Sequence, residues 1–150
     1  MKDKNIHKER ELYLPEGFEA TSRIGDVMGR GEHANIYTEV LKSKAFKSLS
    51  LSSKATYQYF IMSKTTETYP VYVKFQYRCA VEYGICASPA TFVKIKKEFV
   101  EYGIMDQVET DDYKPTQWLK LSSRWRWYGS EHFIFSAYTT SNEDREIGAL

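Results

Sequence analysis

YGICASPATFVKIKKEFVEYG, residues 83–103, carries the clearest structural signals in the chain. Gly84 is suited to ending a short helix, because glycine readily adopts the left-handed conformation that follows many helix C-termini. Ser88 and Pro89 predict the start of the next helix: the hydroxyl can accept a hydrogen bond from a free first-turn N–H, and proline is tolerated at the first helical position. The final glycine predicts its end. The stretch is therefore typical of a helix-turn-helix whose second helix covers residues 88–102.

The predicted helix 88–102 is amphipathic. Its apolar side chains recur at spacings of three and four and form one stripe, which consists of Phe92, Ile95, Phe99 and Val100. Thr91, Lys94 and Lys97 fall away from that stripe. A capped helix that turns lysines outward fits a recognition helix in a DNA major groove, because its N-terminal amides favour phosphate and its first exposed side chains reach base edges. An ordinary amphipathic helix is the alternative interpretation.

The pattern on either side of the helix-turn-helix predicts strands and a further helix. Apolar and polar residues alternate over 104–109 and 117–121, which predicts a β-hairpin with a loop of about seven residues. Residues 71–75 alternate in the same way, and Ser50 is a candidate cap for a helix over 51–63. The predicted fold is therefore α+β: a winged helix-turn-helix with about three core helices and a small antiparallel sheet that includes the wing hairpin.

Three regions are predicted along the chain. Residues 1–35 contain four glycines, scattered apolar residues and mixed charge, which indicates a loosely ordered N-terminal arm. Residues 36–129 form the predicted winged helix domain. Residues 130–150 are predicted to be a C-terminal strap followed by a polar, acidic and frayed tail.

The charge distribution is more informative than the formal net charge of +1. Residues 42–130 carry 14 basic and 8 acidic side chains, whereas both ends of the chain are acidic overall. This modest basic excess is compatible with nucleic-acid binding. No apolar run approaches the ~20 residues that span a bilayer, and the N-terminus is charged throughout, so we expect a cytoplasmic protein without membrane contact.

Enzyme activity is not expected from this sequence. The three histidines, His7, His33 and His132, are far apart and follow no metal-ligand spacing. No recognisable motif supplies a nucleophile with a base. We therefore expect no catalytic residues, no metal, no cofactor and no small-molecule ligand.

Several segments together carry a resemblance to a known group of proteins. SKAFKSLS before a helix, YGI followed by SPATFVKIKKEFVEYGIMD, and the closing LKLSSRWRWYG resemble small winged helix-turn-helix proteins of Gram-positive bacteria, their phages and conjugative elements. Some of these proteins are described as replisome-organiser-like and others as regulators. The resemblance covers residues 38–129 and implies a winged helix that acts in replication initiation or transcriptional control of a mobile element.

Two departures from that group affect the expected DNA contacts. Pro89 and Ala90 stand where relatives often carry polar residues, so fewer side chains can read bases. The predicted wing carries acidic residues against a single lysine, Lys114, and like charge repels phosphate; the acidic residues are Asp106, Glu109, Asp111 and Asp112. The resemblance therefore implies DNA contacts for the recognition helix but not for the wing.

The leading functional prediction is non-catalytic binding of duplex DNA through the helix 88–102. Thr91 and Lys94 are expected at base edges, and Ser88 with the first amides of the helix at a phosphate. Salt-dependent contacts with the DNA backbone are expected from Lys54, Lys96, Lys97, Arg124 and Arg126. The two arginines alternate with tryptophans, for which there are two interpretations: they stack on bases, or they cover the core. The second is favoured, and it leaves the arginines on the surface.

The alternative prediction is a protein-protein interaction module on a winged-helix scaffold, because fold does not determine function. In that interpretation Phe133, Phe135 and Tyr138 form a partner or dimer surface. A homodimer is also considered for the DNA-binding protein, because two-fold symmetry doubles the base contacts of a single helix. The tail after Gly129 is the candidate interface.

Overall fold

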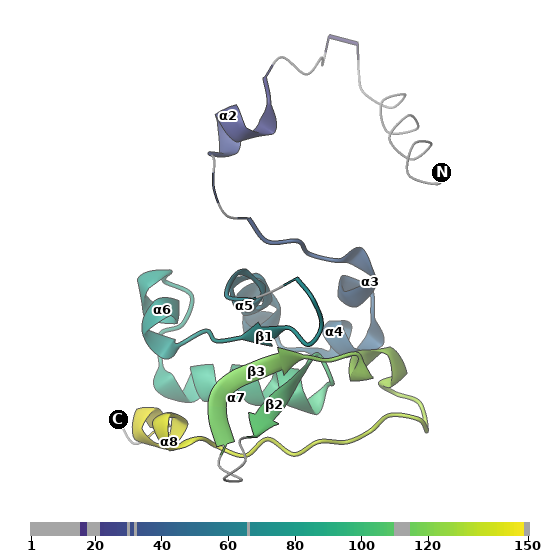
Figure 1. Cartoon of the computed structure of the whole chain (residues 1–150), viewed down its shortest axis with the longest axis vertical. Coiled ribbons are helices and arrows are strands. Elements are labelled where there is room, and N and C mark those ends of the chain that lie inside the picture. Colours follow the sequence, from purple (N-terminus) through teal and green to yellow (C-terminus); the bar gives the residue numbers. More distant parts are fainter. Residues whose placement is uncertain are drawn as a thin grey trace. The chain divides into compact units, whose positions relative to one another are not determined.

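The computed structural model describes residues 16–17, 22–29, 31, 33–65, 67–109 and 115–148. The chain divides into two compact units, residues 1–32 and 33–150. The described part of the first unit contains one short helix, α2 (Ile24–Met28). The remaining described helices and strands belong to the second unit, including those that follow residue 130 (Figure 1).

Serine caps begin two of the first three helices of the second unit. These helices are α3 (Thr38–Leu41), α4 (Lys44–Ser48) and α5 (Leu51–Met62). Ser43 caps α4 by accepting a hydrogen bond from the Phe46 N–H at 3.1 Å. Ser50 caps α5 by accepting one from the Ser53 N–H at 3.3 Å. The predicted cap at Ser50 is thus confirmed.

The predicted helix-turn-helix is present as α6 (Tyr77–Glu82) and α7 (Pro89–Glu101). Between them Gly84 has φ +69°, the left-handed conformation expected after a helix. Ser88 caps α7, since its Oγ accepts a hydrogen bond from the Thr91 N–H at 3.1 Å, and Pro89 occupies the first turn. The predicted start of α7 is therefore confirmed.

Three short strands form an antiparallel sheet. They are β1 (Tyr72–Val73), β2 (Met105–Glu109) and β3 (Pro115–Leu121), with β3 in the middle. Tyr72 pairs with Lys120 across β1 and β3, and Gln107 pairs with Leu119 across β2 and β3. The predicted hairpin and its third strand are confirmed. Of the charged residues predicted in the wing, Asp106 and Glu109 lie in β2, whereas Asp111, Asp112 and Lys114 fall outside the described residues.

The core lies between α5, α7 and the inner face of the sheet. Phe60 of α5 stacks on Phe92 and meets Phe99 edge-on, with ring centroids 6.1 and 5.1 Å apart. From the sheet, Val73 and Leu119 are buried against the same cluster. The predicted apolar stripe of α7, which consists of Phe92, Ile95, Phe99 and Val100, is wholly buried. Aromatic packing of this kind orients α7 with its opposite side toward solvent.

The chain beyond β3 returns along the domain. A 3₁₀ helix, η1 (Arg124–Trp127), follows the sheet, and an extended segment then leads to α8 (Asn142–Gly148), which lies beside α7 (Figure 1). The tail was predicted to fray, but α8 is a helix held to the domain. Its anchor is the buried Asp144, which a sequence of mostly polar residues does not reveal.

The unit of residues 33–150 is α+β with a small three-stranded antiparallel sheet. The order α5, β1, α6, α7, β2 and β3 is compatible with a winged-helix layout. Among the described helices, none has the length and apolar character needed to cross a membrane.

Candidate nucleic-acid interface

The side of α7 opposite the core carries four of the predicted DNA contacts. Thr91, Lys94 and Lys97 are exposed at successive three-residue steps, and the Lys97 side chain is 55% exposed. Ser88 precedes them at the helix start, with its Oγ 2.8 Å from Thr91 Oγ1. We call Thr91, Lys94, Lys97 and Glu101 the exposed flank of α7. The structure therefore brings together the residues predicted to approach bases and phosphate at this helix.

The exposed flank is basic, but not uniformly so. Lys97 Nζ lies 3.7 Å from Glu101 Oε1 in an exposed pair. A lysine placed four residues before a glutamate is the weaker orientation of such a pair on a helix, and exposed pairs contribute little to stability. Lys97 can therefore exchange Glu101 for a phosphate at small cost.

Glu98 also lies on α7, yet it is turned toward the start of α5. Its Oε1 accepts a hydrogen bond from the Ser50 N–H at 3.1 Å, and its Oε2 accepts hydrogen bonds from the Ser50 and Ser53 hydroxyls. Burial opposes ionisation, but these hydrogen bonds and the charge of Lys94 outweigh it and lower the pKa of Glu98. The Glu98 carboxylate thus joins α7 to α5 and is half-buried.

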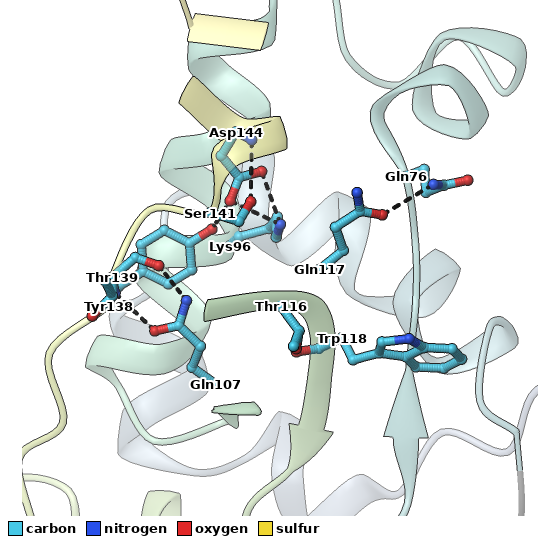
Figure 2. Close-up of polar contacts among 10 residues, drawn as sticks. All are labelled: Gln76, Lys96, Gln107, Thr116, Gln117, Trp118, Tyr138, Thr139, Ser141 and Asp144. Atoms are coloured by element: carbon cyan, nitrogen blue, oxygen red, sulfur yellow. Dashed lines mark hydrogen bonds and ion pairs between the residues drawn. The ribbon is translucent and has the colours of Figure 1, made fainter. Parts of the chain in front are cut away.

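Lys96 does not belong to the exposed flank. It is buried, and its Nζ lies 3.0 and 3.1 Å from the two carboxylate oxygens of Asp144 (Figure 2). The same ammonium is 5.7 Å from the ring centroid of Phe92, one turn earlier on α7. Because position 96 follows Phe92 by four residues, it shares the buried side of the helix. The prediction that Lys96 contacts the DNA backbone is therefore wrong.

Asp144 is the centre of a polar cluster on the buried side of α7. Its carboxylate also accepts a hydrogen bond from the Tyr138 hydroxyl, and its backbone N–H donates to Ser141 Oγ at 3.1 Å (Figure 2). Burial opposes ionisation, but the charge of Lys96 and the hydrogen bonds lower the pKa of Asp144. Burial and Asp144 together raise the pKa of Tyr138. No local pattern indicates this cluster, because Lys96 and Asp144 are 48 positions apart.

The extended segment before α8, residues 133–141, is bonded to the edge strand β2. The Thr139 N–H donates a hydrogen bond to Gln107 Oε1 at 2.8 Å, and the Gln107 side-chain amide donates to the Thr139 carbonyl (Figure 2). The Gln107 amide thus bonds the Thr139 backbone in both directions, as a neighbouring strand would. The segment is therefore an ordered strap across the edge of the sheet.

Arg124 was predicted to lie on the surface, and this is wrong. Its side chain is 13% exposed, and its Nε lies 2.6 Å from Asp106 Oδ1. The guanidinium also donates to the carbonyls of Val100 and Ile134 at 2.8 and 2.7 Å. Five donors in a fixed fork allow one arginine to bridge the end of α7, strand β2 and the strap. Arg124 is thus a structural residue.

Arg126 and Lys54 lie outside the exposed flank. Arg126 is half exposed, pairs with Glu39 Oε1 at 2.6 Å and stacks over the Trp125 ring at 4.6 Å. Lys54 is half-buried on α5. In the part of the chain that the structure describes, neither forms a hydrogen bond or ion pair with α7. The structure therefore assembles four of the eight predicted contacts on one helix side.

Comparisons with known proteins identify no relative of this chain. No protein-family model, curated protein or solved structure matches the chain significantly. The arrangement of α7 and its neighbours therefore carries the functional conclusion.

Proposed function

We propose that this chain is a winged-helix protein that binds duplex DNA without catalysing a reaction. The observation that carries the proposal is the geometry of α7, a capped helix that presents Thr91, Lys94 and Lys97 together on the side away from the core. Such a helix can enter a major groove, with its N-terminal residues at base edges. The order of helices and strands supports the winged-helix layout.

The roles of the proposed contacts follow from their positions on α7. Thr91 and Lys94 lie nearest the N-terminus and would reach base edges, while Ser88 and the first-turn amides would hold a phosphate. Lys97 would contact a phosphate one turn later. Lys54 and Arg126 remain proposed backbone contacts outside α7. The buried Lys96 and the mostly covered Arg124, whose guanidinium is paired with Asp106, are removed from the set.

The biological context of the proposal comes from the sequence resemblance over residues 38–129. It favours replication initiation or transcriptional control of a mobile element. Either role requires recognition of a particular duplex site, and two-fold symmetry would double the bases that one α7 can read. A homodimer on a palindromic site is therefore the form of the complex that we propose.

The test is binding to random-sequence duplex DNA, measured by fluorescence anisotropy at about 50 and 200 mM salt. We expect Lys94→Glu/Lys97→Glu to abolish binding. Lys42→Glu/Lys47→Glu is the matched control, because both lysines are exposed on or beside α3 and α4 and the change in net charge is the same. The control should retain most of the affinity. Equal losses in the two variants would show general attraction to DNA and contradict a specific role for α7.

A second variant pair separates base reading from backbone contact. Thr91→Ala should reduce the preference for a selected site over random DNA, since a good base contact is worth roughly 1–3 kcal/mol. Lys97→Ala should weaken binding to all sequences alike. The same pattern in both variants would overturn the proposed roles.

A protein-interaction module is the second candidate, and one observation favours it. Phe135 is 85% exposed and adjoins the exposed Ile134 on the strap. The rest of the predicted surface is not available, because Phe133 is buried and Tyr138 is half-buried against Asp144. If this patch forms a dimer interface, Phe135→Ser should convert the dimer to a monomer in sedimentation analysis. An unchanged sedimentation coefficient would remove the patch from consideration.

A further inference from the structure

A groove lies between strand β3 and the beginning of α8. None of its lining residues belongs to the exposed flank of α7. Its volume is about 300 Å³, and it is lined by Lys74, Thr116, Gln117, Trp118, Ser141, Asn142 and Glu143. This volume falls at the lower end of the range for small-ligand sites, ~300–1,000 Å³. Figure 2 shows four of the lining residues: Thr116, Gln117 and Trp118 on β3, and Ser141 just before α8.

The groove continues onto the outer face of the sheet. Side chains alternate along a strand, so Trp118 and Lys120 project away from the buried Leu119 between them. Lys74 Nζ lies 5.5 Å from the centroid of the Trp118 ring. Tyr72 pairs directly with Lys120. Two aromatic rings and two ammonium groups therefore share this face, and Asp106, which is ion-paired with Arg124, lies opposite Lys120 on β2.

The pairing of Trp118 with Lys74 fits a planar ring that carries a phosphate. An aromatic face stacks with any nucleobase, and a nearby cation attracts the phosphate of the same nucleotide. The remaining lining groups can form hydrogen bonds with base edges. Gln117 accepts from Gln76 at 3.2 Å, which leaves its NH₂ group as a donor, and Asn142 offers both a donor and an acceptor. Glu143, the one acidic residue among the described lining residues, can accept from an exocyclic amino group.

Stacking on Trp118 requires a base with a free face. In a duplex each base face is covered by its neighbours, whereas in a single strand the bases can be splayed apart and stack on aromatic side chains. We propose that this face binds single-stranded nucleic acid: one unpaired base stacks on Trp118 in place of the Lys74 ammonium, which moves from the ring to an adjoining phosphate, and a further phosphate lies at Lys120. The site is separate from α7 and does not rest on duplex binding.

The test is anisotropy titration of the full chain against a labelled single-stranded DNA of mixed sequence, about 12 nucleotides long. Trp118→Ala should weaken binding about 5- to 150-fold, the range measured when one stacking aromatic is lost. Trp127→Ala is the matched control, because Trp127 is 53% exposed on η1 and lies outside the groove. It should bind like the wild type. Trp118→Phe, which keeps an aromatic face, should restore most of the lost affinity.

Further variants distinguish this site from α7. Lys74→Ala should lower the slope of log affinity against log salt by about 0.7, the value for one phosphate of a single strand. Lys94→Glu/Lys97→Glu should lose duplex binding and keep single-strand binding. Equal affinities of Trp118→Ala and wild type, or loss of single-strand binding in the α7 variant, would overturn the proposed site. If the wild type binds the single strand but does not bind duplex DNA, the proposed function is overturned and this site still stands.

Discussion

Lys96 and Lys97 are adjacent in the sequence, yet they lie on two different sides of α7, one buried and one exposed. The Lys96 side chain is 4% exposed and its ammonium lies 3.0 Å from Asp144 Oδ1. The Lys97 side chain is 55% exposed and its ammonium is 3.7 Å from Glu101. One hundred degrees of rotation about the helix axis separates them. The comparison shows that a run of lysines on an amphipathic helix must be divided by helical position before any of them is assigned to DNA.

The two ion pairs also differ in their expected energetic importance. Removing one partner of a buried pair leaves an uncompensated charge out of water and costs roughly 3–5 kcal/mol. An exposed pair contributes about 0–1 kcal/mol. The buried side of α7 should therefore govern stability, and the exposed flank should govern binding.

The largest expected effect is that of Asp144→Ala. It leaves the Lys96 ammonium and the Tyr138 hydroxyl without their shared partner, so we expect the free energy of unfolding to fall by roughly 3–5 kcal/mol. Chemical denaturation at pH 7 measures this value. Glu101→Ala, which removes the partner of Lys97, should change it by less than about 0.5 kcal/mol. In Lys96→Met/Asp144→Leu no charge is left unpaired, and most of the stability should return.

The next largest effect is expected from the two arginines of the RWRW segment. Arg124→Ala removes hydrogen bonds to Asp106, Val100 and Ile134, and we expect a loss of roughly 2–3 kcal/mol in unfolding free energy. Arg126→Ala breaks the exposed pair with Glu39 and the exposed contact with the Trp125 ring, so its loss should stay at about 1 kcal/mol or below. Equal losses in urea denaturation would contradict the structural assignment of Arg124.

Acidification should weaken the domain through Asp144 and Glu98. Both folded-state pKa values are lowered, so the stabilisation is fully present above the ordinary values of about 3.9 and 4.3 and is lost as pH falls through the folded-state values. We expect the unfolding free energy to decline below about pH 5. The decline should be shallower in Lys96→Met/Asp144→Leu, since that variant lacks the buried carboxylate. Parallel curves for the variant and the wild type would exclude a role for Asp144.

A smaller effect is expected at the start of α7. Ser88→Ala removes the acceptor of the Thr91 N–H and should cost about 1 kcal/mol in thermal unfolding experiments. Ser88→Gly should cost only a few tenths of a kcal/mol, because glycine leaves the amide open to water. A larger loss of stability in Ser88→Gly than in Ser88→Ala would indicate that the Ser88 hydroxyl does not cap α7.

The sequence predicted the elements whose signals are local. Ser50, Ser88 and Gly84 marked helix ends through caps and backbone freedom, and the spacing from Phe92 to Val100 identified the buried stripe. Alternation located the hairpin and the strand that pairs with it. The sequence alone was thus sufficient for the α+β class and for the orientation of α7.

The errors concern contacts between distant segments. Lys96 and Arg124 resemble surface cations in the sequence, and only the return of the chain supplies Asp144, Asp106 and the strap carbonyl that bind them. The polar tail carried no periodic signal, since its anchor is one buried carboxylate and not an apolar face. Local patterns could not specify these partners.

The most direct test of the account is the salt dependence of duplex binding in two variants of α7. For each variant the slope of log affinity against log salt counts the phosphates that the protein neutralises, at about 0.9 for each. We predict that Lys94→Gln/Lys97→Gln lowers the slope by about one to two, and that Lys96→Met/Asp144→Leu leaves it unchanged. A lower slope in the second variant, or an unchanged slope in the first, would contradict the division of α7 into a structural side and a DNA-binding side.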